Sequence, residues 1–124
     1  MTLDFTSDIP IYMQIKNSVI AGIASGALKE GQPLPSVRQL AGDVGVNMQT
    51  VNKAYIMLKQ EGYINIHRRK GAIIAGKISA DNGRNKIIAR NLGIIANEAI
   101  SRNMSKEGFL KMCEEAYLNS KGGF

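Results

Sequence analysis

The sequence predicts a mostly helical α+β protein, with three helices and a β-hairpin in residues 1–76 and two more helices in residues 77–124. Three observations support this prediction. Apolar residues recur at helical intervals, capping and turn residues divide them into short segments, and two β-prone runs flank a cationic turn. A polar link over residues 79–83 separates the two parts, so we expect one domain followed by a helical segment.

The first helix is expected after an extended lead-in over residues 1–9. Its inward face consists of apolar residues spaced four apart, namely Ile11, Ile15, Val19 and Ile23. Gly26 lies where this helix should end. Residues 27–35 include two prolines, which predicts a connection between helices.

Capping residues delimit the second and third helices. Ser36 opens the second helix, because Ser36 to Gln39 has the capping-box pattern in which a hydroxyl accepts from the N3 amide. Gly45 supplies the left-handed residue that commonly follows a helix, and Asn47 caps the third helix. The inward stripe of this third helix is Val51, Ala54, Tyr55 and Leu58, which leaves outward Gln49, Asn52, Lys53 and Lys59.

A hairpin is expected after Gly62, where the third helix ends. Two short β-prone runs, residues 63–67 and 72–75, lie on either side of Arg68-Arg69-Lys70-Gly71. The hairpin therefore has a cationic tip. A short helix, a tight turn, a second helix and a hairpin, in this order, make a helix-turn-helix with a wing.

Two amphipathic helices are expected in the last part of the chain. The first should end near Asn103, and the second should run from a Ser105 cap to about Asn119, with residues 121–124 frayed. This pair exposes more apolar surface than one helical hairpin can hide, so pairing with a second copy is favoured over folding back onto the first domain. The residues expected at the dimer interface are Ile88, Leu92, Ile95, Ala99, Phe109, Cys113 and Tyr117.

The net charge and the composition indicate which kind of partner and which compartment to expect. The net charge of +6 favours a polyanion, most simply nucleic acid, but both parts of the chain carry the same charge balance. One cysteine and no signal peptide fit a reducing cytoplasm, and the apolar runs are too short to span a membrane. We see no nucleophile-base set, paired acids or metal cluster, and so expect no catalysis, cofactor or metal ion.

The start of the third helix is expected to contact base edges in a DNA major groove. The amides of Gln49 and Asn52 suit adenine, Thr50 can reach a phosphate, and Lys53 places a charge near the backbone. Asn47 is mainly a helix cap. Met48 offers either apolar contact with a thymine methyl or nothing specific, and both readings stay open.

Two further elements are expected to contact DNA. Arg38, at the start of the second helix, can pair with guanine or clamp a phosphate, and Ser36 can cap its helix while that helix end binds a phosphate. At the wing tip, Arg68, Arg69 and Lys70 exceed what a solubilising turn needs, so we favour contact with a minor groove or with phosphates.

These motifs resemble the GntR family of bacterial transcription regulators. The resemblance rests on fixed spacing between the segments 10–15, 34–41 and 45–47, together with Thr50-Val51, Ala54-Tyr55, Leu58, Gly62 and Gly71. The short tail resembles that of the YtrA-type subgroup, which implies a homodimer and, in many members, repression of ABC-type transporter operons. The family's DNA contacts fall on Ser36, Arg38, Gln49, Thr50, Lys53 and the wing tip around Lys70-Gly71. Two positions depart from the pattern: Arg69 replaces a usual glycine, and Met48 replaces a frequent arginine.

The predicted function is therefore a homodimeric, sequence-specific DNA-binding regulator, favoured as a repressor, on an inverted-repeat operator. The alternative is a protein-interaction adaptor that uses the winged helix as a scaffold. The amide and cationic recognition face disfavours this alternative. A small-molecule effector, if the protein has one, is expected between the tail and the first domain or across the dimer, because the tail is too small for a buried cavity.

Overall fold

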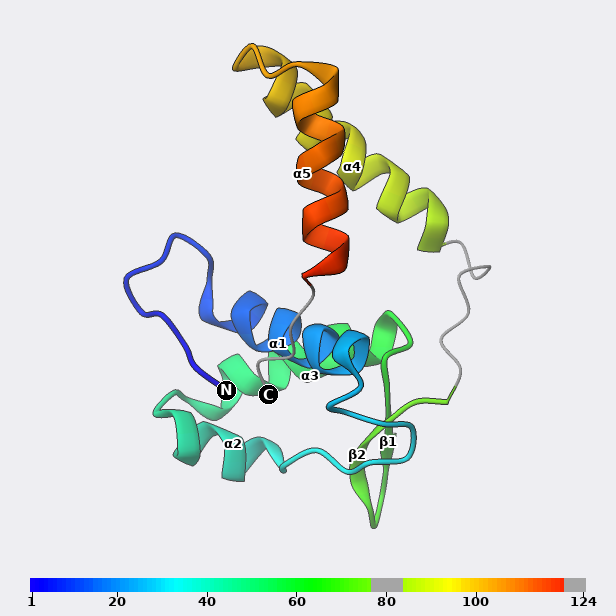
Figure 1. Ribbon diagram of the computed structural model, residues 1–124. Helices are drawn as coiled ribbons and strands as arrows, with labels where there is room; N and C mark the ends of the chain where they lie inside the picture. Colours follow the sequence, from blue (N-terminus) through cyan, green and yellow to red (C-terminus); the bar gives the residue numbers. More distant parts are fainter. Residues whose placement is uncertain (77–83, 120–124) are drawn as a thin grey trace. The chain divides into compact units, whose positions relative to one another are not determined.

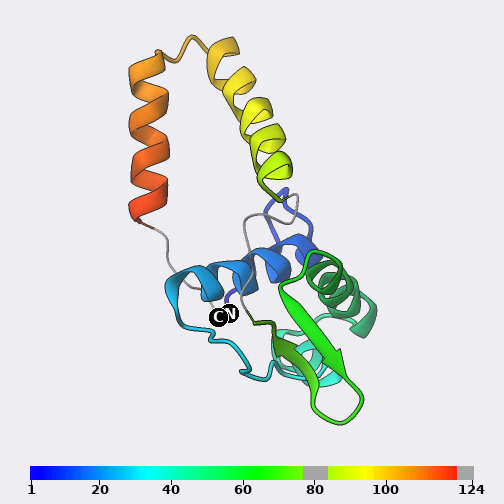
Figure 2. The same ribbon diagram turned by 90° about the vertical axis from the view of Figure 1, so that its right-hand side faces the viewer.

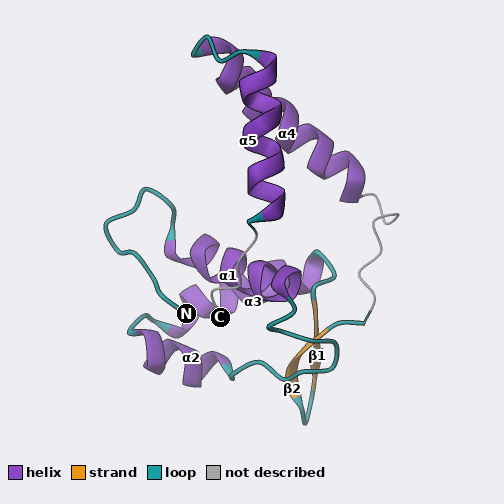
Figure 3. Cartoon of the chain, viewed as in Figure 1, coloured by secondary structure: helices purple, strands orange, loops and turns teal. Residues whose placement is uncertain are grey.

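The computed structural model describes residues 1–76 and 84–119 (Figure 1). The described elements are α1 (Ile11–Ser25), α2 (Val37–Val44), α3 (Met48–Gln60), β1 (Ile64–His67), β2 (Gly71–Ile74), α4 (Arg84–Ser101) and α5 (Lys106–Leu118). They fall into two compact units, one on each side of residues 77–83 (Figure 3). The predicted polar link over residues 79–83 and the predicted frayed end lie outside the described residues.

The core of the first unit lies between α1, α3 and the hairpin. Ile15 and Val19 of α1 and Val51 and Leu58 of α3 are fully buried, and Ile64 of β1 closes the core from the wing side. The helical stripes that the sequence predicts are thus confirmed as inward faces. Burying side chains of this size contributes about 1.5–3 kcal/mol each, so these residues are a large source of the unit's stability.

The predicted caps form hydrogen bonds of good geometry. The Ser36 Oγ accepts from the Gln39 amide at 3.0 Å, and the Asn47 Oδ1 accepts from the Thr50 amide at 2.8 Å. Gly26 and Gly45 follow α1 and α2 with φ of 83° and 74°, the left-handed conformation that glycine adopts without a Cβ clash. These four residues set where α1 and α2 end and where α2 and α3 begin.

The wing is paired on both edges of β2. On one edge, β1 and β2 are antiparallel, with Ile64 opposite Ile74 and His67 opposite Gly71. On the other edge, residues 31–34 bond to β2: Leu34 N donates to Ala72 O at 2.9 Å, and Ile74 N donates to Gln32 O at 2.9 Å. The sequence predicts only a connection here, but this segment anchors the wing to the body of the domain.

The lead-in is not extended, contrary to the sequence-based expectation. Residues 5–9 form turns and bends, because the Asp4 carboxylate accepts from the Thr6 amide at 2.9 Å and from the Thr6 hydroxyl at 2.6 Å. These hydrogen bonds stabilise the charged carboxylate and lower the pKa of Asp4. The Gln14 Nε2 then donates to the carbonyls of Asp4 and Ile9, which ties the turn to α1.

The second unit is an open pair of helices. Figure 2 shows α4 and α5 running in opposite directions and diverging from the turn that joins them. In that turn Asn103 takes a left-handed conformation with φ 62°, and the Met104 amide donates to Ala99 O at 2.9 Å. Ser105 caps α5 as predicted, its Oγ accepting from the Gly108 amide at 3.0 Å.

Candidate nucleic-acid interface

The start of α2 and the middle of α3 are tied together by one buried phenol. The Tyr55 hydroxyl donates to Pro35 O at 2.7 Å, one residue before the Ser36 cap. Burial raises the pKa of Tyr55 to about 12, so the phenol remains a protonated donor at any ordinary pH. Arg38, the second residue of α2, is exposed and is therefore carried at a fixed position relative to α3.

The first turn of α3 uses two polar side chains for its own capping. The Asn47 Oδ1 accepts from both the Thr50 amide at 2.8 Å and the Thr50 hydroxyl at 2.9 Å. Reading adenine requires an amide's oxygen and nitrogen together, so Asn47 in this state is a cap and not a base reader. The single hydroxyl proton of Thr50 is also engaged, and a phosphate oxygen needs a donor. The predicted Thr50 contact therefore requires this bond to be exchanged.

The exposed face of α3 has two rows. Met48, Asn52 and Ile56 are spaced by four residues and are all exposed, so they form one row along the helix. Gln49 and Lys53 form the adjacent row. Ile56 is not among the predicted site residues, although its spacing of four from Asn52 places it on the same row.

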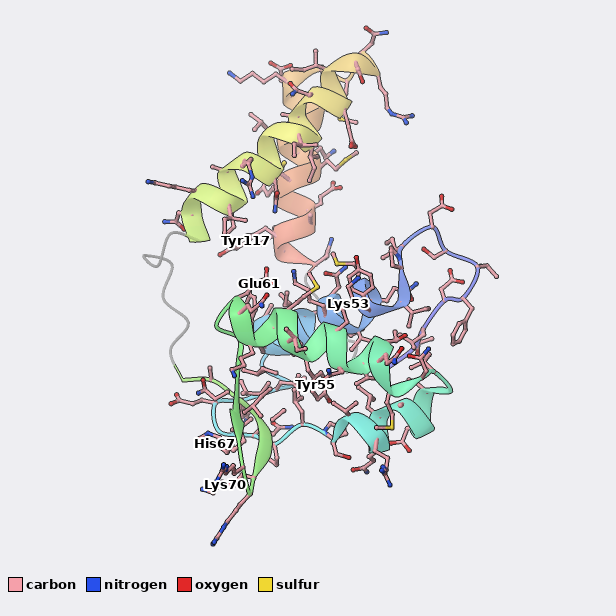
Figure 4. The ribbon with its side chains drawn as sticks, turned by 180° about the vertical axis from the view of Figure 1, so that it is seen from behind. Lys53, Tyr55, Glu61, His67, Lys70 and Tyr117 are labelled. Atoms are coloured by element: carbon pink, nitrogen blue, oxygen red, sulfur yellow. The ribbon has the colours of Figure 1, made fainter. Side chains whose placement is uncertain are left out.

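Lys53 is directed towards α1. Its Nζ lies 3.9 Å from the centroid of the Tyr12 ring, a cation–π contact between α3 and α1. Figure 4 shows Lys53 on the α1 side of α3, whereas Lys70 lies at the tip of the wing. The structure therefore places Lys53 apart from Lys70 of the wing tip and gives it a partner in α1, Tyr12, which is not among the predicted site residues.

The wing tip presents three consecutive exposed cations. Arg68, Arg69 and Lys70 connect β1 to β2, and Gly71, with φ 71°, begins the return strand. The sequence from Ile64 to Ala75 contains no acidic residue, so nothing within the hairpin neutralises this charge. A side chain at position 71 would be strained by the left-handed backbone, which explains the glycine there.

Other chemistries find little support in the described residues. Across 1–76 and 84–119, no group of three or more His, Cys, Asp or Glu side chains is arranged to hold a metal ion. Among the described helices, none has both the length and the apolar character needed to cross a bilayer.

The second unit carries an apolar groove of about 420 Å³. Its lining comes from both helices and consists of Leu92, Ile95, Phe109, Met112, Cys113, Ala116 and Tyr117. Five of the seven predicted interface residues are thus brought together. Ile88 is exposed on α4 outside this lining, whereas Ala99 is only 7% exposed because the turn before α5 packs against it within one chain.

Comparison with known proteins decides the family. The family model described as bacterial regulatory proteins, gntR family, matches residues 11–74, which is more than half of the chain. The chain belongs to the GntR family. The matched residues are those that build α1, the two capped helices and the wing, so the predicted winged helix-turn-helix and the predicted family are both confirmed.

Similar GntR proteins share the short tail as well. The transcriptional repressor YtrA of Bacillus subtilis (strain 168) is 32% identical over 123 residues, covering 98% of this chain and 95% of YtrA. YtrA from Sulfolobus acidocaldarius, described as a GntR-family transcription factor, is 38% identical, with a TM-score of 0.61 over 94% of this chain and 95% of that chain. This GntR protein therefore has the YtrA-type organisation that the tail predicts.

Two other solved structures bear on the fold and on DNA. A transcriptional antiterminator from Listeria monocytogenes EGD-e has a TM-score of 0.90 at 27% identity, covering 99% of this chain and 93% of that chain. The DNA-binding domain of AraR in complex with operator ORE1 has a TM-score of 0.52 at 26% identity, covering 60% of this chain and 90% of that chain. The present protein is a DNA-binding GntR-family transcription regulator, and its relatives are regulators and not enzymes.

Proposed function

We propose that this protein is a homodimeric repressor that binds an inverted-repeat operator. The observation that carries the proposal is the Tyr55–Pro35 hydrogen bond, which ties the capped start of α2 to the middle of α3. A helix N-terminus offers free amides and a partial positive charge to a phosphate, while side chains of its first turns reach base edges. The similar Bacillus YtrA is named a repressor, which supports the direction of regulation.

The proposed DNA contacts follow from exposure and hydrogen bonding. Arg38 reads guanine from α2, and Gln49 and Asn52 read bases from α3, because all three side chains are exposed. Ser36 keeps a hydroxyl proton for a phosphate while its oxygen caps α2. Arg68, Arg69 and Lys70 contact the minor groove or its phosphates, and Gly71 permits the turn that presents them.

The proposed dimer uses the second unit. Leu92 is 46% exposed and Ile95 is 50% exposed although both line an apolar groove, which a single chain leaves open to water. A second copy of the same helices would cover this surface and carry the second α3 to the other half of the operator. We accordingly take residues 1–76 as the DNA-binding domain and residues 77–124 as the dimerisation segment.

The proposed cellular location and the proposed target operon follow from the resemblance to the YtrA-type subgroup. We propose that the protein acts in the cytoplasm, where its operator is, and that the operon it represses encodes a membrane transporter. Any small-molecule effector would bind across the dimer.

Selection from a random pool of double-stranded DNA tests this function. The full chain should enrich an inverted repeat whose half-sites lie about one helical turn apart, 10–10.5 base pairs, since two related recognition helices must enter successive major grooves. Binding to the enriched site should also weaken steeply with added salt, because counterions are released from the phosphates. A pool in which no site is enriched would overturn the proposal and favour the protein-interaction adaptor.

A further inference from the structure

The first turns of α3 carry an exposed apolar side chain where a base-reading cation would be expected. Met48 is the first residue of α3 and is 47% exposed. The segment 48–52 contains no lysine or arginine, and Lys53 is turned towards Tyr12.

Two of the other polar side chains of this turn, Asn47 and Thr50, are already engaged, and Gln49 lies on the adjacent row. Asn47 and Thr50 bond to one another, which removes the Asn47 oxygen and the Thr50 proton from base reading. Asn52 lies one turn beyond Met48 on the same row, about 6 Å along the helix axis at 1.5 Å per residue. The row that faces away from the core therefore begins with a thioether and continues with an amide.

These two side chains match the two halves of A·T base pairs. In the major groove, thymine presents a C5-methyl group, which takes apolar contacts, and adenine presents N7 and N6, which pair with an amide. Guanine instead presents two acceptors, which an arginine or lysine reads. Methionine is unbranched and polarizable, so it can adapt to a methyl group without a fixed geometry.

We propose that Met48 determines operator specificity by packing on the 5-methyl group of a thymine, with Asn52 reading an adenine beside it. The part of each half-site under α3 is then an A·T segment, and guanine is read from α2 by Arg38. This inference rests on the proposed function and adds the base class that α3 selects. A role for Met48 in the core is disfavoured, because core methionines are buried and this one is half exposed.

The test removes one methyl group at a time. In the site enriched from the random pool, each thymine of one half-site is replaced singly by deoxyuridine, which differs from thymidine only by lacking the methyl. With the unmodified protein, one position should lose about fourfold in affinity, the effect of burying one methyl group. The variant Met48→Ala should bind the thymine and deoxyuridine sites equally at that position.

Two further variants complete the test. Ile56→Ala removes another exposed apolar side chain of α3 and should retain the sensitivity at the Met48 position. Met48→Arg should shift the preferred base there from thymine to guanine in a repeated pool selection. Thermal unfolding of each variant should match that of the unmodified protein, because both side chains are exposed.

The test can refute the proposed role of Met48 without refuting the proposed function on which it rests. If a site is enriched but no single deoxyuridine weakens binding, or if Met48→Ala keeps the same sensitivity, the Met48 assignment is wrong while the regulator stands. A half-site with guanine under α3 would also overturn it. Failure to enrich any site would instead overturn the proposed function.

Discussion

The Tyr55 hydroxyl of α3 donates a hydrogen bond to the carbonyl oxygen of Pro35, 20 residues earlier in the chain, at 2.7 Å. The Tyr55 side chain is almost fully buried, and Pro35 directly precedes the residue that caps α2. Two elements that we propose to carry separate DNA contacts are therefore tied together by this bond. Its loss should affect stability and DNA binding together.

Replacing Tyr55 with phenylalanine should lower the free energy of unfolding by about 1 kcal/mol, because the Pro35 carbonyl loses its partner while the ring packing remains. Urea unfolding at pH 7 measures this difference. Tyr12→Phe, on a half-buried tyrosine of α1 whose ring packs against the core, serves as the matched control.

The same variant should also change the response to alkali. The pKa of Tyr55 is about 12 in the folded protein against an ordinary 10.0, so between these values the folded state retains a proton that the unfolded chain has released. The free energy of unfolding therefore falls as pH rises from 10 to 12, and Tyr55→Phe lacks this component. The difference between the two proteins should shrink across that window, and a constant difference would contradict the assignment.

Lys53 and Lys70 should differ in how they affect the salt dependence of DNA binding. Lys70→Ala removes a wing cation and should reduce the slope of log affinity against log salt by about 0.9, the value for one phosphate contact. Lys53→Met keeps the apolar stem but removes the charge over Tyr12, so it should leave the slope unchanged and lower stability by about 0.5 kcal/mol. Equal losses of slope would show that Lys53 also contacts a phosphate.

Arg38→Ala should weaken specific binding by about 1–3 kcal/mol and relax selectivity at one base pair, since a bidentate arginine–guanine contact is lost. Gel-shift titrations on the enriched site and on single-base variants measure both effects. Arg90→Ala, which removes an exposed charge from α4, controls for net charge. If the two variants behave alike, Arg38 does not read a base.

Leu92→Lys should convert the proposed dimer to monomers, because a charge would be placed in the apolar groove that the second copy is proposed to cover. Light scattering measures the mass directly. Ile94→Lys is the matched control, since Ile94 is a comparably exposed apolar residue of α4 that does not line the groove. Dimers that persist in the Leu92 variant, or that are lost equally in both, would refute this choice of face.

The parts of the fold that depend on near neighbours could be predicted from the sequence. Ser36, Asn47 and Ser105 cap their helices through bonds to the amide three residues ahead, so their signals lie within one helical turn. The buried stripes follow from helical spacing for the same reason. The strand bounds differed by one residue at each start, β1 beginning at Ile64 and β2 at Gly71.

The parts that depend on distant partners could not be predicted. Nothing near Leu34 indicates that it pairs with β2, and nothing near Asp4 shows that Gln14 will hold its carbonyl. In the candidate site, too, features set by near neighbours could be predicted and features set by distant partners could not. Exposure of Arg38 and of the wing cations was predicted from local pattern, but the direction of Lys53 depends on Tyr12 of another helix.

The pairing of residues 31–34 with β2 restricts which insertions and deletions this regulator can tolerate. Leu34 is bonded to the wing two residues before Ser36 opens α2, so one short stretch of chain sets the positions of both elements. Adding or deleting a residue there would shift the wing relative to α2. Both elements would then be displaced from the positions proposed for their DNA contacts. Grafting a foreign wing onto this protein therefore requires transplanting the connection ahead of α2 with it.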